Sequence, residues 1–328
     1  MIGIFKNNHP SNNFILFIYG LALRWASFIN PQAPEIQKDD PYLFRLVAEA
    51  MIGIFSFNPY VYSFFLFFLI FILAVFVNRL INAQKLFHRP NDFAGMCLML
   101  FTAVMPGWDA FNSGFLLSCL LAGIVLILLS MSSNNDARAK SFNIGFLLGI
   151  AMLIYTPAFL FLFLLLIGLI ILRPFRAQEW ALIFLGISTP VYFMLSFLFL
   201  SDVPFSVLNP IFTVGLAKMS FPLYNTLGAS LIFILMLIGF GFSQSNQRKL
   251  LVQSRNCWST LFVYTVISLI LPFFNTHSFS TTLMPVLISG SIFGAAAFYY
   301  PERKWLSVLS HLLLWVSAIT NGYFSLFH

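Results

Sequence analysis

Long stretches without a charged residue dominate this chain and limit what it can fold into. Residues 60–78, for instance, are mostly apolar and contain no Asp, Glu, Lys or Arg. About 20 such residues in a helix cross the hydrocarbon core of a bilayer. Only 8% of all residues are charged, against about 25% in soluble domains. The sequence therefore predicts an all-α, polytopic transmembrane bundle, organised as a single integral membrane domain over residues 1–328.

The spacing of the apolar segments predicts about eleven membrane spans. They fall at residues 13–30, 60–80, 93–107, 113–131, 142–155, 157–172, 180–200, 226–243, 257–274, 280–299 and 305–323.

Two regions of this layout are irregular. Tyr155-Thr156-Pro157 interrupts the run 142–172, and proline removes a helix hydrogen bond and clashes with the preceding turn. We therefore predict two short helices that meet at a turn, with a single kinked helix as the alternative. Residues 203–222 contain three prolines and are expected to form a re-entrant or surface segment.

The basic residues predict the orientation. With the N-terminus inside, thirteen of the seventeen Lys and Arg residues fall on the inner side, Arg24 falls within the first span, and only Lys38, Arg45 and Lys218 fall outside. Inner loops of membrane proteins carry such an excess. We predict a multi-pass protein of the bacterial inner membrane, with a cytoplasmic N-terminus and a periplasmic C-terminus. The net charge of +7 is explained by these loops and indicates no nucleic-acid partner.

The first outer loop, residues 30–60, contains an amphipathic helix signal. Asp40 suits the N-cap and Pro41 the first helical position. One helix face is then apolar, formed by Leu43, Leu46, Val47, Ala50, Met51 and Ile54. A helix over residues 41–55 is too short to span a bilayer, and we expect it to lie along the outer membrane surface.

Asp39 and Asp40 at the start of this helix are the first candidates for chemistry. A carboxylate beside an apolar surface can act as a general base, and Asp40 could also bind a divalent metal ion such as Mg²⁺ or Mn²⁺. The alternative is a solvated loop in which Asp40 only caps the helix.

Asp109 and Arg24 are the next candidates. Asp109 lies in a short outer turn, PGWDAFNSG, and Arg24 lies inside the first apolar segment. An arginine there can extend toward the surface and pair with a carboxylate or a lipid phosphate. We expect Asp39 or Asp40, Arg24 and Asp109 to converge on one outward-facing cavity. Turn chemistry for Asp109 and a structural ion pair for Arg24 are the alternatives. His277, in an outer turn, is a weaker ligand candidate.

The order of these features resembles the GT-C superfamily of membrane glycosyltransferases over residues 1–175. The matching stretches are DDPYLFRLVAEAM, then MPGWDAFNSGFLL, then the glycine-rich FNIGFLLGIAM with Gly145, Gly149 and Ala151. Residues 176–328 would be additional spans. The chain is also similar in character to Phe-rich polytopic inner-membrane proteins of Bacteroidota, a resemblance that implies no activity.

The GT-C resemblance implies transfer of a sugar from a polyprenyl-phosphate donor at the outer face. Asp39 or Asp40 would activate an acceptor hydroxyl or hold a divalent metal against the phosphate, and Arg24 or Lys218 would neutralise the lipid phosphate. Asp109 is a further candidate catalytic residue. Two other functions stay open. One is a non-catalytic membrane subunit or scaffold with a partner protein in the cell envelope, and the other is a lipid or solute transporter.

Overall fold

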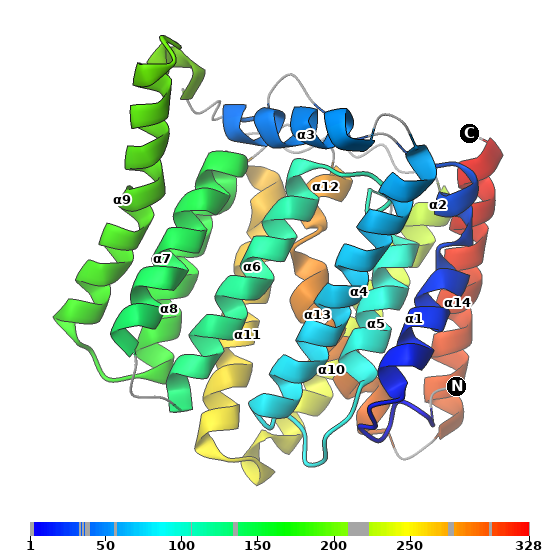
Figure 1. Ribbon diagram of the computed structural model, residues 1–328. Coiled ribbons are helices and arrows are strands. Elements are labelled where there is room, and N and C mark those ends of the chain that lie inside the picture. Colours follow the sequence, from blue (N-terminus) through cyan, green and yellow to red (C-terminus); the bar gives the residue numbers. More distant parts are fainter. Residues whose placement is uncertain are drawn as a thin grey trace.

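The computed structural model describes residues 3–32, 34, 36, 40–55, 58–105, 107–133, 137–208, 223–274, 279–301 and 304–327. All regular elements in these ranges are helices (Figure 1). The α-helices are α1 (Asn12–Leu23), α2 (Trp25–Ile29), α3 (Tyr42–Phe55), α4 (Pro59–Ala83), α5 (Phe93–Val104), α6 (Ser113–Ser130), α7 (Ala137–Ile154), α8 (Phe161–Leu172), α9 (Ala177–Leu200), α10 (Leu223–Asn246), α11 (Val252–Ile270), α12 (Phe279–Leu283), α13 (Val286–Tyr299) and α14 (Lys304–Phe327). Short 3₁₀ helices are η1 (Met131–Ser133), η2 (Thr156–Leu160), η3 (Phe205–Leu208), η4 (Gln247–Lys249) and η5 (Leu271–Phe273).

Seven of the described helices, not eleven, are long and apolar enough to cross a membrane: α4, α6, α7, α9, α10, α11 and α14. The expected spans at 13–30, 93–107, 157–172 and 280–299 correspond to shorter apolar helices. A 12-residue helix such as α1 or α5 is only about 18 Å long, whereas the hydrocarbon core is about 30 Å thick. Apolar composition alone therefore overestimated the number of spans.

The break predicted at Tyr155 is confirmed. α7 ends at Ile154, η2 follows with Pro157 near its start, and α8 begins at Phe161. Tyr155 itself has an extended backbone. The prediction for residues 203–222 lies largely outside the described residues.

Two of the shorter helices form the centre of the bundle. Nearly every side chain of α5 and α13 is buried, and the two helices pack against each other. A helix that is apolar all round belongs inside other helices rather than at a surface. Helices from both halves of the chain pack on this centre, since α4 contacts α5 and α10 contacts α13.

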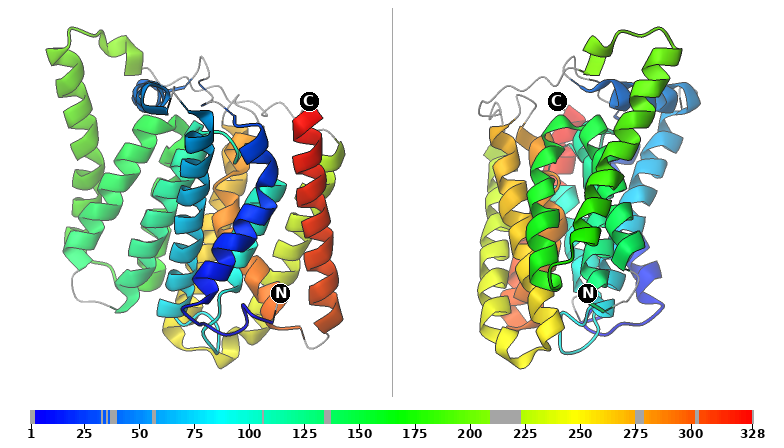
Figure 2. Two further views of the ribbon diagram at one scale, coloured as in Figure 1. Left: turned by 45° about the vertical axis from the view of Figure 1, so that its right-hand side comes forward. Right: turned by 90° about the vertical axis from the view of Figure 1, so that its left-hand side faces the viewer.

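α9 is the most peripheral helix in the views of Figures 1 and 2 and packs mainly on α7. The contact is made through glycines. A Cβ atom on Gly145 would collide with the carbonyl oxygen of Ile183, and one on Gly186 would collide with the carbonyl oxygen of Phe142. Small residues let membrane helices approach at backbone distance. The glycine motif of the predicted GT-C element therefore has a packing role in this fold.

α3 crosses one end of the bundle (Figure 1), as a surface helix should. Its buried side is centred on Phe44 and Ala48, and Phe44 stacks on Phe111 at 5.9 Å between ring centroids. Ala50 and Ile54, expected to face lipid or other helices, are exposed. We call this end of the bundle the α3 end.

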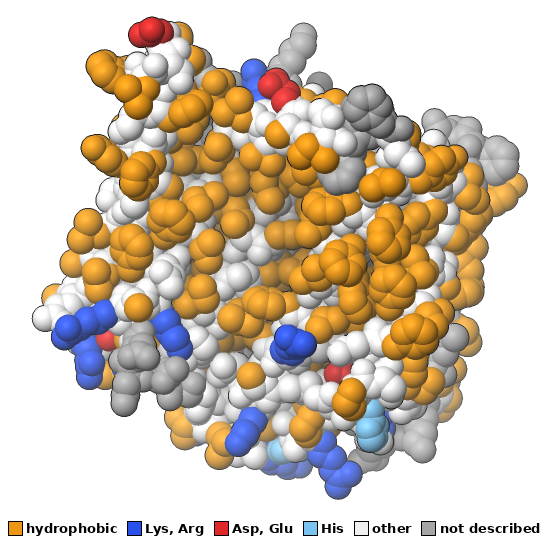
Figure 3. All heavy atoms as spheres, viewed as in Figure 1, with side chains coloured by type: hydrophobic (Ala, Val, Ile, Leu, Met, Phe, Trp, Pro, Cys, Tyr) orange, Lys and Arg blue, Asp and Glu red, His pale blue; other side chains and the backbone are white. Residues whose placement is uncertain are grey.

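The opposite end carries most of the basic residues. Consecutive long helices alternate in direction (Figures 1 and 2), so the α4–α5, α6–α7, α8–α9 and α10–α11 connections meet there. These connections and the helix ends beside them contain Arg79, Lys85, Arg89, Arg138, Lys140, Arg173, Arg176, Arg248, Lys249 and Arg255. We call it the basic end. Figure 3 shows a broad apolar band between this end and the α3 end, which is the pattern of a multi-pass membrane protein.

Candidate functional site

Arg24 lies where the first apolar segment breaks. α1 ends at Leu23 and α2 begins at Trp25, and the Arg24 backbone has φ −105° and ψ 24° between them. Its N–H still donates to the carbonyl oxygen of Gly20 at 3.1 Å. The side chain is only 4% exposed. The break thus turns one cationic side chain toward the interior, near the α3 end.

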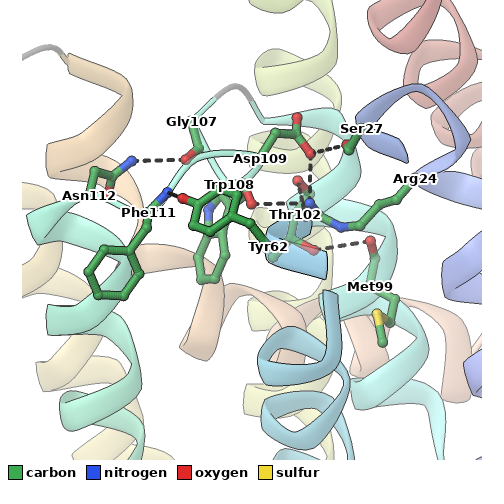
Figure 4. A network of polar contacts seen from close by, with 10 residues as sticks. All are labelled: Arg24, Ser27, Tyr62, Met99, Thr102, Gly107, Trp108, Asp109, Phe111 and Asn112. Carbon is green, nitrogen blue, oxygen red and sulfur yellow. Dashed lines mark hydrogen bonds and ion pairs between the residues drawn. The ribbon is translucent and has the colours of Figure 1, made fainter. Parts of the chain in front are cut away.

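The guanidinium group of Arg24 is held by neighbours from α5 and the α5–α6 turn (Figure 4). Nη1 donates to Asp109 Oδ1 at 2.7 Å and to the carbonyl oxygen of Trp108 at 3.1 Å, and Nη2 donates to the carbonyl oxygen of Thr102 at 2.9 Å. These bonds use three of the five guanidinium N–H groups. Nε–H has no hydrogen-bond partner among the described residues.

The turn that carries Asp109 is fixed by its own hydrogen bonds. Gly107 has a positive φ of 94°, which glycine adopts without steric cost. Asn112 Nδ2 donates to the Gly107 carbonyl at 2.9 Å, and the backbone N–H of Phe111 donates to Tyr62 Oη at 2.6 Å. The carboxylate therefore approaches Arg24 from a constrained turn (Figure 4).

Asp109 is the more accessible member of the pair, with its side chain 36% exposed. Its Oδ1 accepts from Arg24 and also from Ser27 Oγ at 2.5 Å. The other oxygen, Oδ2, accepts no hydrogen bond from the described residues. One oxygen thus serves the ion pair and the other remains able to accept a proton or a hydrogen bond.

Arg24 and Asp109 line a cavity of about 170 Å³ whose wall is partly polar and partly apolar, and we call it the polar cavity. Asn225 of α10 and Asn321 of α14 complete its polar wall. Asn321 Nδ2 donates to the carbonyl oxygen of Val104, and its Oδ1 is buried without a partner among the described residues. Arg24 Nε–H and Asn321 Oδ1 thus lie behind the cavity wall, buried and without partners among the described residues.

An apolar cavity of about 410 Å³ lies beside it, and Met105 lines both. Its walls come from α10, η5, α12 and α13 and the ends of α5 and α11, with Phe233, Met236 and Leu287 among them. Together the two cavities offer polar and apolar surroundings to one ligand. That combination suits an amphiphile.

The structure brings Arg24 and Asp109 together but places Asp40 differently. Asp40 is 4% exposed and does not line either cavity. Asp39, Lys218 and His277 lie outside the described residues. The roles assigned to these residues remain predictions.

The metal ion expected at Asp40 stays a prediction, because neighbouring Asp39 lies outside the described residues. No group of three His, Cys, Asp or Glu side chains in the described parts of the chain could hold one. We therefore derive no metal-dependent step.

Asn225 and Asn321 were missed by the sequence reasoning. Each is an amide within an apolar helix, and a polar side chain inside a membrane helix is costly unless it faces a partner or a cavity. That signal could have selected them as candidates. It could not have paired them with Arg24, because no local pattern links residues that are about 200 and about 300 positions apart.

Comparison with known proteins identifies the family but no activity. The profile of a family of unknown function, DUF6427, matches residues 42–326, which include Asp109 but not Arg24. A search of curated proteins and a search of solved structures found no match. No link to the GT-C superfamily emerges from these comparisons. Because the match covers most of the chain, this multi-pass membrane protein belongs to the DUF6427 family.

Proposed function

We propose that this protein binds a phosphate-bearing lipid at the α3 end and acts on its head group. The observation that carries the proposal is that Met105 lines both the polar cavity of Arg24 and Asp109 and the larger apolar cavity, which are therefore neighbours. A lipid head group would occupy the first cavity and the start of its hydrocarbon chain the second.

The polar cavity suits a phosphate group that also carries a hydroxyl-rich substituent. The remaining guanidinium N–H groups of Arg24 can donate to a phosphate oxygen, since charged donors bind phosphate well. The side-chain amide of Asn225 also lines this cavity, and an amide can donate to or accept from a hydroxyl group. Because Asp109 already balances the charge of Arg24, the phosphate would share the guanidinium with this carboxylate.

More specifically, we propose that the protein is a glycosyltransferase that uses a polyprenyl-phosphate-linked sugar as its donor. Asp109 Oδ2 would take the proton of the acceptor hydroxyl while the acceptor oxygen attacks the anomeric carbon of the sugar. The bond between that carbon and the phosphate oxygen would break, and polyprenyl phosphate would leave. Asp109 is favoured over Asp40 as the base because it lines the cavity. Asp39, Lys218 and His277 remain proposed contributors.

We place the α3 end on the periplasmic side of the bacterial inner membrane. The gathering of Lys and Arg at the basic end supports this orientation, since such residues mark cytoplasmic loops. The polar cavity would then open toward the compartment in which polyprenyl-linked sugars are transferred by GT-C enzymes, as the resemblance implies.

Reconstituted protein tests the proposal with a polyprenyl-phosphate donor that carries a radiolabelled sugar. The measurements are donor binding and release of polyprenyl phosphate. Asp109→Asn should bind the donor but release product at least about 100-fold more slowly, as expected for loss of a general base. Glu49→Gln, at an exposed carboxylate of α3, is the control and should match the wild type. Full activity of Asp109→Asn, or failure of the wild type to bind the donor, would contradict the proposal.

A scaffold without catalysis is the second candidate. Three hydrogen bonds hold Arg24 to Asp109, Trp108 and Thr102. They favour a scaffold, because a buried ion pair such as Arg24–Asp109 can have a purely structural role. Mild-detergent purification separates the two functions. A stoichiometric envelope protein without bound polyprenyl phosphate would support the scaffold, and the reverse would support the lipid-dependent enzyme.

A further inference from the structure

A second polar cavity lies at the basic end, far along α4 from the α3 end. It has a volume of about 290 Å³ and is lined by four asparagines, Asn8, Asn13, Asn78 and Asn82, together with Arg79 and Asp92. The lining comes from the segment before α1, the first turn of α1, the last turns of α4 and the residue before α5. A single ordered water needs only about 10–15 Å³, so this cavity is large enough for a small polar molecule.

The cavity presents one cation and one anion that are not paired with each other. No ion pair within 4.0 Å joins Arg79 or Asp92 to any described residue, since those found are Arg24–Asp109 and Arg176–Glu179. Arg79 is exposed, whereas Asp92 is 5% exposed. A cation and an anion that line one cavity without forming an ion pair can each bind the complementary charge of a zwitterionic ligand.

The floor of the cavity is built from buried polar groups. Asp92 Oδ2 accepts from Asn12 Nδ2 at 2.7 Å, while Oδ1 accepts no hydrogen bond from the described residues. Asn78 is 4% exposed, and its Oδ1 accepts from the backbone N–H of Gly95 at 2.6 Å. Its Nδ2 is buried without a partner among the described residues. The floor thus keeps an unused acceptor, Asp92 Oδ1, while Asn78 Nδ2 lies buried behind it.

The cavity lies where an apolar stripe of α4 becomes charged. Phe68, Ile72, Val75 and Arg79 follow one another at spacings of four, three and four residues, which places them on one helix face. Phe68 and Ile72 are exposed, as are Phe14 and Ile18 on the neighbouring α1. Acyl chains can therefore cover these side chains while the attached head group reaches Arg79.

We propose that this cavity binds the head group of a lipid that carries both a phosphate and a primary ammonium group, as phosphatidylethanolamine does. The phosphate would accept from Arg79 and from asparagine side chains, and the ammonium group would donate to Asp92 Oδ1. A phosphatidylglycerol head group lacks the cation. The quaternary ammonium of phosphatidylcholine has no N–H to donate. This site is independent of the function proposed for the α3 end.

Native mass spectrometry of the full-length protein tests the proposal through competition among these three lipids. We expect phosphatidylethanolamine to be retained about tenfold over each of the others, which corresponds to one charged hydrogen bond. Arg79→Gln, at an exposed position, should weaken its retention by about tenfold. Asp92→Asn should remove the preference for phosphatidylethanolamine over phosphatidylcholine. Arg89→Gln, an exposed basic-end residue outside the cavity lining, is the control and should leave both values unchanged.

Two outcomes would overturn the proposal: equal or stronger retention of phosphatidylglycerol by the wild type, or unchanged retention in Arg79→Gln. If Asp92→Asn fails to fold, Arg79→Gln and the lipid competition still decide. Competition with soluble phosphoethanolamine shows whether the cavity binds a membrane lipid or a free head group. The proposal requires that it compete much more weakly than the lipid, and equal competition would overturn the assignment to a membrane lipid.

Discussion

At the scale of single residues, the buried pair of Arg24 and Asp109 is the most distinctive feature of the α3 end. Arg24 is almost completely buried and donates to one carboxylate and two backbone carbonyls. A buried cation with such partners stabilises the fold only as long as all of them are present. The pair therefore connects stability to the proposed function, because the same side chains line the polar cavity.

Replacement of Arg24 by Leu should destabilise the protein by about 3 kcal/mol, at the lower end of the range for a broken buried pair. The lower end is expected because Asp109 is partly exposed and can regain water. Thermal unfolding in detergent measures the effect. Arg138→Leu is the control, since Arg138 is exposed, and it should change stability by less than about 0.5 kcal/mol. Equal stability of the two variants would contradict a structural role for the pair.

Asp92 should make stability depend on pH. Burial raises the pKa of this carboxyl group, although its bond to Asn12 and the nearby His9 oppose the shift. The folded state then binds the proton more tightly than the unfolded state, so stability falls as pH rises. The fall should occur between the ordinary Asp value of about 3.9 and the raised value. Unfolding midpoints measured against pH should show this fall in the wild type and in Glu49→Gln, but not in Asp92→Asn.

At the scale of helices, the glycine contact between α7 and α9 gives a sharp prediction. Gly145→Ala would place a methyl group against the carbonyl of Ile183 and should cost about 1–3 kcal/mol, as overpacking does. Gly123→Ala on α6 is a matched control, because its Cβ would meet only Leu147 Cδ1, at 3.7 Å. That variant should have unchanged stability or be stabilised by up to about 1 kcal/mol, because alanine has a higher helix propensity than glycine. If both variants melt alike, the backbone contact does not limit stability.

Helices with strong local signals could be predicted from the sequence. Pro157 revealed the break between α7 and α8, and the amphipathic pattern revealed α3. The docked face of α3 was not predictable, because its apolar residues cover more of the helix than one face and only tertiary contact with Phe111 selects Phe44. The number of spans was overestimated, since hydropathy does not distinguish a short buried helix such as α5 from a spanning one.

At the scale of the whole molecule, the account requires a fixed orientation in the membrane. Single cysteines introduced at Arg176, at the basic end, and at Asp202, after α9, can report it, because both positions are exposed. Cys97 and Cys257 are buried and Cys119 is partly buried, so they should react slowly. A membrane-impermeant maleimide should label Asp202→Cys in spheroplasts and Arg176→Cys only after lysis. The opposite labelling pattern would place the α3 end in the cytoplasm.

The central claim is that one amphiphile occupies both cavities lined by Met105. Crosslinking with a photoreactive polyprenyl phosphate tests it most directly in membranes that contain the whole protein. We predict crosslinks to residues of the apolar cavity, such as Met236 and Leu287, and their loss in Ala229→Trp, which fills that cavity. Val316→Trp, on an exposed position of α14, should leave them intact. Crosslinks confined to outward-facing residues, or unaffected by Ala229→Trp, would contradict the claim.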